Sequence, residues 1–222
     1  MKRSALIAWL LFAPALSFSQ GVGVGTRIDL TAKLNLNNGA TGQFAQVFIP
    51  DYFWPAVDDS FTLVFHLHSA SWAAENEVYR SNTNAILFNI HLGALSSPYQ
   101  SYFTAQTNFQ KILDSVAAVL RSNNIIAQPK IRRLILTSFS AGYAGVREIL
   151  KTYYGRINAL TLADGLHCNS DSATMRVQMQ DFVRYARDAK EKHKVFLLTH
   201  SSITTSGYES TTATANSRVV NM

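Results

Sequence analysis

Residues 134–145 read LILTSFSAGYAG, an apolar run that breaks abruptly into a serine flanked by small residues. A run that ends in this way is typical of a buried strand that turns sharply into a helix, with Ser140 at the turn. A serine before a helix can equally be an N-terminal cap without any chemistry, because its hydroxyl accepts a hydrogen bond from a free backbone N–H. The choice between these two interpretations depends on the rest of the chain.

Strands and helices are predicted to alternate around this stretch. Short, continuously apolar runs indicate strands buried on both faces, and apolar residues three or four positions apart indicate helices. The predicted strands lie at 61–67, 84–90, 131–137, 157–163 and 194–199, and the predicted helices at 103–120, 141–154 and 172–190. Two earlier β-type runs, 27–36 and 43–49, flank the turn-rich link 37–42 and predict an N-terminal β-hairpin. This order predicts an α/β fold with a mostly parallel central sheet, right-handed crossovers and helices on both faces.

The 222 residues predict a single domain preceded by an export signal. Lys2 and Arg3 are followed by the apolar run 5–16 and then by small residues, which is the pattern of a cleaved signal peptide. The run is too short to span a bilayer, which takes about 20 residues. We therefore predict a signal peptide at 1–19 and one domain at 20–222. The protein is predicted to be secreted or periplasmic, without stable membrane insertion after signal removal; a retained N-terminal anchor is the alternative.

Charge and cysteine content narrow the possible classes of function. Without Lys2 and Arg3, the chain carries 18 Lys and Arg against 14 Asp and Glu, and the excess is scattered along the sequence. A basic stripe with interleaved aromatic residues is missing, so nucleic-acid binding is not predicted. Cys168 is the only cysteine, so an exported form would depend on its core and not on an internal disulfide.

Serine, histidine and aspartate gather at the predicted carboxyl ends of the strands. Functional groups of parallel α/β sheets collect at this edge. The strand ends read HSASW at 68–72, HLG at 91–93, SFSAG at 138–142, DGLH at 164–167 and HSS at 200–202. This concentration of polar side chains predicts a functional site at that edge.

From these motifs and the element order, residues 43–202 resemble the α/β-hydrolase superfamily, in particular its exported esterase-like members. The stretch SFSAG is similar to the Gly-x-Ser-x-Gly elbow of that family, with Ser138 in place of the first glycine. The resemblance implies that Ser140 is a nucleophile and that the backbone N–H of Ala141 binds the developing oxyanion. It implies no cofactor.

The same resemblance implies further binding residues around the nucleophile. The family often has His-Gly-Gly where this chain has residues 68–70, so a second oxyanion donor is expected from the backbone of Ser69 or Ala70. Trp72 and Tyr143 are candidates for the walls of an acyl or alcohol pocket.

The acid and the base of a triad are harder to assign. Asp164 follows the first strand after the elbow, whereas most members of the family carry the acid one strand later. The family histidine follows a further strand, but residues 201–222 contain no histidine and no convincing strand. Two hypotheses follow: either the chain lacks its last strand and histidine loop, or His200 is the base from an unusual position. His167 is a less favoured base because it follows Asp164 so closely.

Two other kinds of chemistry are weaker interpretations. His66 and His68 lie two residues apart on a predicted strand and so face the same side, a spacing that is compatible with a metal site. No adjoining carboxylate completes a metal-binding pattern. Cys168 has no elbow around it and is interpreted as a small core residue. No metal site is therefore predicted.

Taken together, the sequence predicts a secreted serine hydrolase, a carboxylic-ester hydrolase that forms an acyl-enzyme on Ser140. Its substrate would be a small-molecule or polymeric ester. A serine peptidase would use the same residues, and a non-catalytic binding or structural protein, or an inactive fragment, could share the fold.

Overall fold

The computed structural model describes residues 23–36, 42–169 and 171–201. The predicted signal peptide, most of the predicted hairpin link and the tail beyond Ser201 lie outside these residues.

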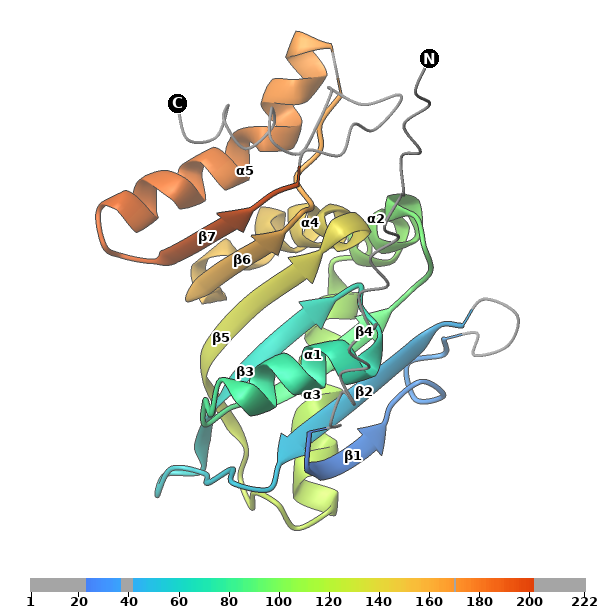
Figure 1. Ribbon diagram of the computed structural model, residues 1–222, viewed down its shortest axis with the longest axis vertical. Helices are drawn as coiled ribbons and strands as arrows, with labels where there is room; N and C mark the ends of the chain where they lie inside the picture. Colours follow the sequence, from blue (N-terminus) through green and yellow to red (C-terminus); the bar gives the residue numbers. More distant parts are fainter. Residues whose placement is uncertain (1–22, 37–41, 170, 202–222) are drawn as a thin grey trace, which may run out of the picture.

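The described part of the chain forms one mixed sheet and a set of helices (Figure 1). Its strands are β1 (Gly25–Asp29), β2 (Phe44–Pro50), β3 (Ser60–Leu67), β4 (Ile86–His91), β5 (Lys130–Phe139), β6 (Ala159–Ala163) and β7 (Val195–Thr199). Its α-helices are α1 (Ser71–Arg80), α2 (Ser96–Thr104), α3 (Thr107–Ser122), α4 (Tyr143–Tyr153) and α5 (Ser172–Lys190). Two short 3₁₀ helices, η1 (Ser140–Gly142) and η2 (Tyr154–Arg156), precede and follow α4.

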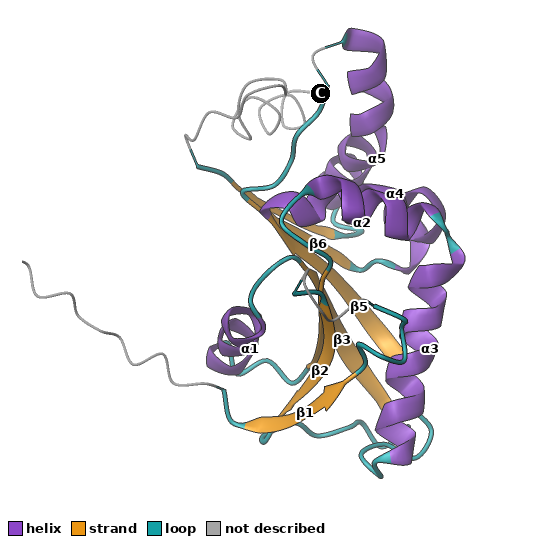
Figure 2. Cartoon of the chain, turned by 90° about the vertical axis from the view of Figure 1, so that its right-hand side faces the viewer, coloured by secondary structure: helices purple, strands orange, loops and turns teal. Residues whose placement is uncertain are grey.

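The sheet has the order β1-β2-β4-β3-β5-β6-β7. The pairs β1–β2 and β2–β4 are antiparallel, and every pair from β4 to β7 is parallel. Helix α1 lies on one face, and α2 to α5 lie on the other (Figure 2). The predicted α/β fold is confirmed, with its mostly parallel sheet, its helices on both faces and its N-terminal hairpin of β1 and β2.

Two predicted elements differ from those observed, and one observed helix was not predicted. The predicted strand 27–36 ends at Asp29, after which the chain turns, with the Leu34 N–H bonded to the Leu30 carbonyl. The predicted helix 103–120 is two helices, because Ala105 leaves the helical region with φ −72° and ψ 91°. Helix α1 was not predicted, because its buried residues include Glu75 and Asn76 beside Ala74 and Val78 and so show no apolar period.

The main core lies between the sheet and helices α2 to α5. Phe65 on β3 is fully buried there, with its ring centroid 4.8 Å from that of Phe88 and 4.9 Å from that of Phe109. A much smaller apolar cluster, formed by Phe48, Ala74, Val78 and Leu87, holds α1 on the opposite face.

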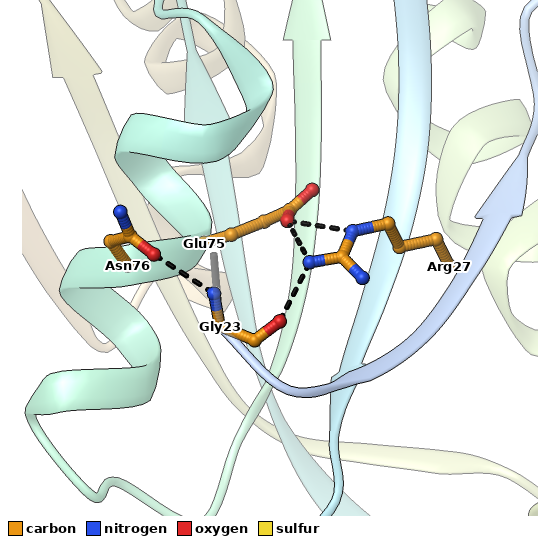
Figure 3. Close-up of polar contacts among 4 residues, drawn as sticks. All are labelled: Gly23, Arg27, Glu75 and Asn76. Atoms are coloured by element: carbon orange, nitrogen blue, oxygen red, sulfur yellow. Dashed lines mark hydrogen bonds and ion pairs between the residues drawn. The ribbon is translucent and has the colours of Figure 1, made fainter. Parts of the chain in front are cut away.

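Polar contacts fasten α1 to the start of the described chain (Figure 3). The Arg27 guanidinium donates to the Glu75 carboxylate at 2.8 Å and to the Gly23 carbonyl at 2.7 Å. The Gly23 N–H donates to Asn76 Oδ1 at 2.9 Å, and the guanidinium lies 5.0 Å from the centroid of the Phe48 ring. The polar buried face of α1 is therefore matched by partners on and before β1.

Among the described residues, no helix covers the α1 face of the sheet beside β5, β6 and β7. Val195 and Leu197 of β7 are exposed on this face, whereas Phe196 between them packs against Tyr185 of α5. Between α1 and the sheet lies a cavity of about 790 Å³, called the α1 cavity below. The apolar run of β7 therefore has one covered face and one exposed face in the described structure.

Candidate active site

Ser140 lies on a sharp turn between β5 and α4. Its φ is +43°, a conformation that is uncommon and strained for any residue with a side chain. The N-cap positions of η1 and α4 are Phe139 and Gly142, and neither makes a side-chain capping bond. Ser140 therefore does not occupy a helix cap, and its backbone is strained where the chain passes from the strand into the helix.

Small residues are required around this turn because three chain segments meet there. A Cβ atom on Gly142 would lie 2.6 Å from the carbonyl oxygen of Leu67, the last residue of β3. A Cβ atom on Gly165 would lie 2.2 Å from the carbonyl oxygen of Ser140. The ends of β3 and β6 therefore press directly against the turn and hold Ser140 in its strained conformation.

The residues predicted to bind an oxyanion lie on both sides of this meeting point. Ala141 follows Ser140 in η1, close to the start of α4. The N–H of His68 donates to the Ile90 carbonyl, so it is used within the sheet. Ser69 and Ala70 follow it and line the α1 cavity. The donor expected on this side thus lies in the segment that leads into α1.

The two predicted pocket residues lie in different cavities. Trp72 is 44% exposed and lines the α1 cavity, together with Phe139, the residue before Ser140. Tyr143 is buried and lines a second cavity of about 210 Å³ on the other side of the elbow, between α2, α4 and the loop after β6. Each of the two residues therefore lines a cavity, on opposite sides of the elbow, and their role in binding an acyl or alcohol group stays a prediction.

Asp164 is placed at the elbow and is held there firmly. Its φ is +46°, and its N–H donates to the Thr199 carbonyl at the end of β7. Its carboxylate accepts the backbone N–H and the hydroxyl of Ser201, each at 2.8 Å. Because Gly165 abuts Ser140, the loop that carries this oriented carboxylate lies against the elbow.

The two candidate bases differ in their relation to Asp164. His200 is exposed, and its only contact within the described residues is between its Nδ1 and the Ser201 carbonyl, at 3.4 Å. Burial lowers the pKa of His167, and the nearby Asp164 charge opposes that shift. The His167 ring lies edge-on to Tyr143, 5.2 Å between ring centroids. The structure brings Asp164 to the elbow but does not bring His200 into contact with it.

The same edge of the sheet carries a row of stacked rings that the sequence did not predict. Phe44, His91, His68 and Phe139 stack in the order of strands β2, β4, β3 and β5, with centroid separations of 5.7, 5.2 and 6.2 Å. Burial lowers the pKa of both histidines, and for His68 the charge of His91 lowers it further. Both imidazoles are therefore favoured in the neutral form.

Tyr99 of α2 is the polar centre of this row. Its hydroxyl lies 2.9 Å from His68 Nδ1 and 3.4 Å from His91 Nδ1, and it accepts the Leu92 N–H at 2.9 Å. No sequence signal points to Tyr99, because its contacts come from strands that precede it by up to 31 residues.

His66 and His68 have separate environments in the structure. His66 Nδ1 lies 2.6 Å from the Thr137 hydroxyl of β5, and burial lowers the pKa of His66 to about 4. His68 follows the end of β3 with φ +68° and bonds to Tyr99. Across residues 23–36, 42–169 and 171–201, no group of three His, Cys, Asp or Glu side chains could hold a metal ion. Over the same ranges, no helix has the length and apolar character needed to cross a membrane.

The strand order and the strained serine after β5 give the described chain an α/β-hydrolase-like fold. No family model matches the sequence, and no curated protein matches it. Among solved structures, the enterobactin esterase of Shigella flexneri is similar, with a TM-score of 0.49 and 11% identity over 80% of this chain and 54% of that one. The ferric enterobactin esterase of Salmonella typhimurium gives a TM-score of 0.48 and 10% identity over 80% of this chain and 53% of that one. A thermostable esterase gives a TM-score of 0.41 and 12% identity over 79% of this chain and 54% of that one. The chain spans about half the length of these structures.

Proposed function

We propose that this protein is a serine hydrolase that cleaves carboxylic esters through an acyl-enzyme on Ser140. The observation that carries the proposal is the strained backbone of Ser140, with φ +43°, in a turn where Gly165 packs against Ser140 and Leu67 packs against Gly142. Strain of this kind is retained where the surrounding structure enforces it, and it is concentrated at functional sites. A serine that only capped a helix would need none of it.

In the proposed reaction, the Ser140 hydroxyl attacks the ester carbonyl while a histidine accepts its proton. The tetrahedral oxyanion is stabilised by the Ala141 N–H and by a backbone N–H of Ser69 or Ala70. Collapse of this intermediate breaks the ester C–O bond, and the histidine returns the proton to the leaving alcohol. Water then attacks the acyl-enzyme with the same histidine as base, which releases the acid and restores the hydroxyl.

Asp164 is the acid that would orient the base. Two hydrogen bonds from Ser201, one from its backbone N–H and one from its hydroxyl, hold this carboxylate beside the elbow, as an orienting group requires. His200 precedes Ser201 in the chain, so a change in its side-chain direction would be needed to bring the imidazole to this carboxylate. Among the described residues, His200 and His167 are the two candidates for this base. On the export pattern of residues 1–19, the enzyme is proposed to act outside the cytoplasm on a small-molecule or polymeric ester.

The test is labelling of the purified protein with a fluorophosphonate probe. We expect the wild type to be labelled and Ser140→Ala to be unlabelled. Ser138→Ala is the matched control, because Ser138 lies in the same motif but its hydroxyl is fully buried and without a hydrogen-bond partner. It should be labelled like the wild type. A folded wild-type protein that resists the probe would contradict the proposal.

Two further variants identify the base, and two substrates identify the bond that is cleaved. His200→Ala and His167→Ala should differ in labelling rate, and the slower one marks the histidine that activates Ser140. Release of nitrophenol from a p-nitrophenyl ester, without release of nitroaniline from a peptidyl p-nitroanilide, would separate an esterase from a peptidase.

The second candidate is a non-catalytic binding protein on the same fold. It is favoured by the exposed position of His200, whose contacts within the described ranges include neither Asp164 nor Ser140. A folded wild-type protein that the probe does not label would support this candidate.

A further inference from the structure

Arg147 of α4 is a buried cation that lacks an ion-pair partner within the described residues. It is only 7% exposed, and its Nε is buried without a hydrogen-bond partner. One terminal nitrogen donates to the His167 carbonyl at 2.6 Å, and the guanidinium carbon lies 5.0 Å from the centroid of the Tyr143 ring. The neighbouring Glu148 does not neutralise it by an ion pair, because both its oxygens bind Lys151, at 2.7 and 2.8 Å.

Such a charge is costly to bury. A guanidinium has five N–H donors, and taking it out of water without a counter-ion costs several kcal/mol. The other buried charged residues in the described ranges, Glu75 and Glu148, avoid this cost because Glu75 pairs with Arg27 and Glu148 with Lys151. Arg147 therefore has the features of a residue whose anionic partner comes from outside the described chain.

The surroundings of Arg147 provide room for that partner. It lines the cavity of about 210 Å³ beside the elbow, which would hold roughly seven waters at about 30 Å³ each. The polar side chains of this lining are Ser96, Ser97, Gln100, His167, Asn169 and Gln178. It contains no Asp or Glu. Hydroxyl and amide donors around an unpaired guanidinium make a site that favours a carboxylate over a neutral or cationic group.

The cavity adjoins the proposed nucleophile. Tyr143 and Ala144 in its wall are the first residues of α4, directly after the elbow, and His167 and Cys168 follow Asp164 by three and four residues. Arg147 lies seven positions after Ser140, which corresponds to about 10 Å along a helix. A group bound at Arg147 would thus lie about this far from the acyl carbon.

We propose that this cavity is an acid-recognition subsite and that the preferred substrates are esters carrying a free carboxylate about 10 Å from the scissile carbonyl. The proposal rests on the proposed esterase function for its substrate role, while binding of the carboxylate itself does not require catalysis. Arg147 is then a specificity-determining residue, which binds the carboxylate by charge-assisted hydrogen bonds.

A matched pair of esters tests the kinetic side. The mono-p-nitrophenyl ester of nonanedioic acid carries its carboxylate at about the required distance, and p-nitrophenyl nonanoate has the same chain length without the charge. We expect kcat/KM of the wild type to be at least tenfold higher on the acid. Arg147→Met should remove this preference, mostly through a higher KM for the acid. Arg147→Lys should retain part of it.

Arg184→Met is the control variant. Arg184 also stacks on a tyrosine, Tyr154, at 4.0 Å, but it is exposed and does not line the cavity. The ratio of kcat/KM on the acid to kcat/KM on the neutral ester should be the same in Arg184→Met as in the wild type. Equal losses on both esters in Arg147→Met, or a loss in Arg184→Met of the same size, would overturn the proposal.

Binding of nonanedioate to the inactive Ser140→Ala protein separates this proposal from the esterase function. Nonanedioate should raise the melting temperature of the wild type and of Ser140→Ala, but not that of Arg147→Met. Nonane-1,9-diol, its neutral analogue, should raise none of them. If no ester is cleaved but nonanedioate still stabilises Ser140→Ala, the subsite stands and the esterase proposal falls. If the diol and the diacid act equally on the wild type, the subsite is refuted, whether or not Arg147→Met folds.

Discussion

Gly165→Ala is the substitution that tests most directly how the elbow is held. The new Cβ would lie 2.2 Å from the Ser140 carbonyl oxygen and 2.9 Å from the Ser140 nitrogen, whereas Cβ contacts under 3.0 Å are essentially never seen. Relief requires the loop after β6 and the turn after β5 to separate by about 0.8 Å. Neither atom belongs to a flexible side chain that could move aside, so the backbone itself must move.

The size of the effect follows from two opposing contributions. Overpacking a close-packed site costs about 1–3 kcal/mol, and a contact with backbone on both sides belongs near the upper end. Replacing glycine by alanine reduces the entropy of the unfolded chain and returns about 0.4–1 kcal/mol. We expect a net loss of about 2 kcal/mol in the free energy of unfolding. For a protein of this size that loss lowers the melting temperature by about 4–8 °C.

The assay compares urea and thermal unfolding of Gly165→Ala with Gly155→Ala. A Cβ atom on Gly155 would have no atom within 4 Å, so this control should be as stable as the wild type or slightly more stable. The rate of fluorophosphonate labelling should fall at least tenfold in Gly165→Ala and stay unchanged in Gly155→Ala. If the two variants are equally stable and equally labelled, the loop after β6 does not press on Ser140, and our explanation of its strained backbone is wrong.

Three further substitutions test the surroundings of the site. The pKa of His66 in the folded state is about 4, below its ordinary 6.5, so the unfolded state binds the proton first and about 3 kcal/mol of stability is lost as the pH falls from 6.5 to 4. In His66→Gln, the unfolding midpoints measured against pH should lack this loss. A pH profile identical to that of the wild type would contradict the prediction. Arg27→Met should cost about 3 kcal/mol in urea unfolding by leaving the buried Glu75 carboxylate unpaired, and the double variant Arg27→Met with Glu75→Leu should recover most of that loss. Tyr99→Phe should cost about 1–3 kcal/mol in thermal unfolding because the buried Leu92 N–H loses its acceptor, and a neutral result would show that another group replaces the hydroxyl.

The local hydrophobic pattern was sufficient to predict the helices and strands whose buried side is apolar. Helix α5 begins and ends at the residues that the sequence predicts, because Asp171 caps it through the Thr174 N–H and Met179 and Phe182 mark its buried stripe. Helix α1 was missed for the opposite reason, since half of its buried face is polar. That face is stabilised by Arg27, 48 residues earlier in the chain, and no local period records such a partner.

By itself, then, the sequence determined the alternation of strands and helices, the elbow motif and the polar residues at the strand ends, because hydrophobic period and turn chemistry act over a few neighbouring residues. Only the tertiary structure decided which strand ends meet. The positive φ of Ser140 occurs where the end of β3, at Leu67, and the loop after β6, at Gly165, pack against the turn. The hydrogen bond of His200 to the Ser201 carbonyl, and not to Asp164, is likewise a feature of the tertiary structure. The same holds for Arg147, whose burial and missing counter-ion arise because α2 and the loop after β6 close over it. Packing between distant segments determines these features, and single-residue patterns carry no information about it.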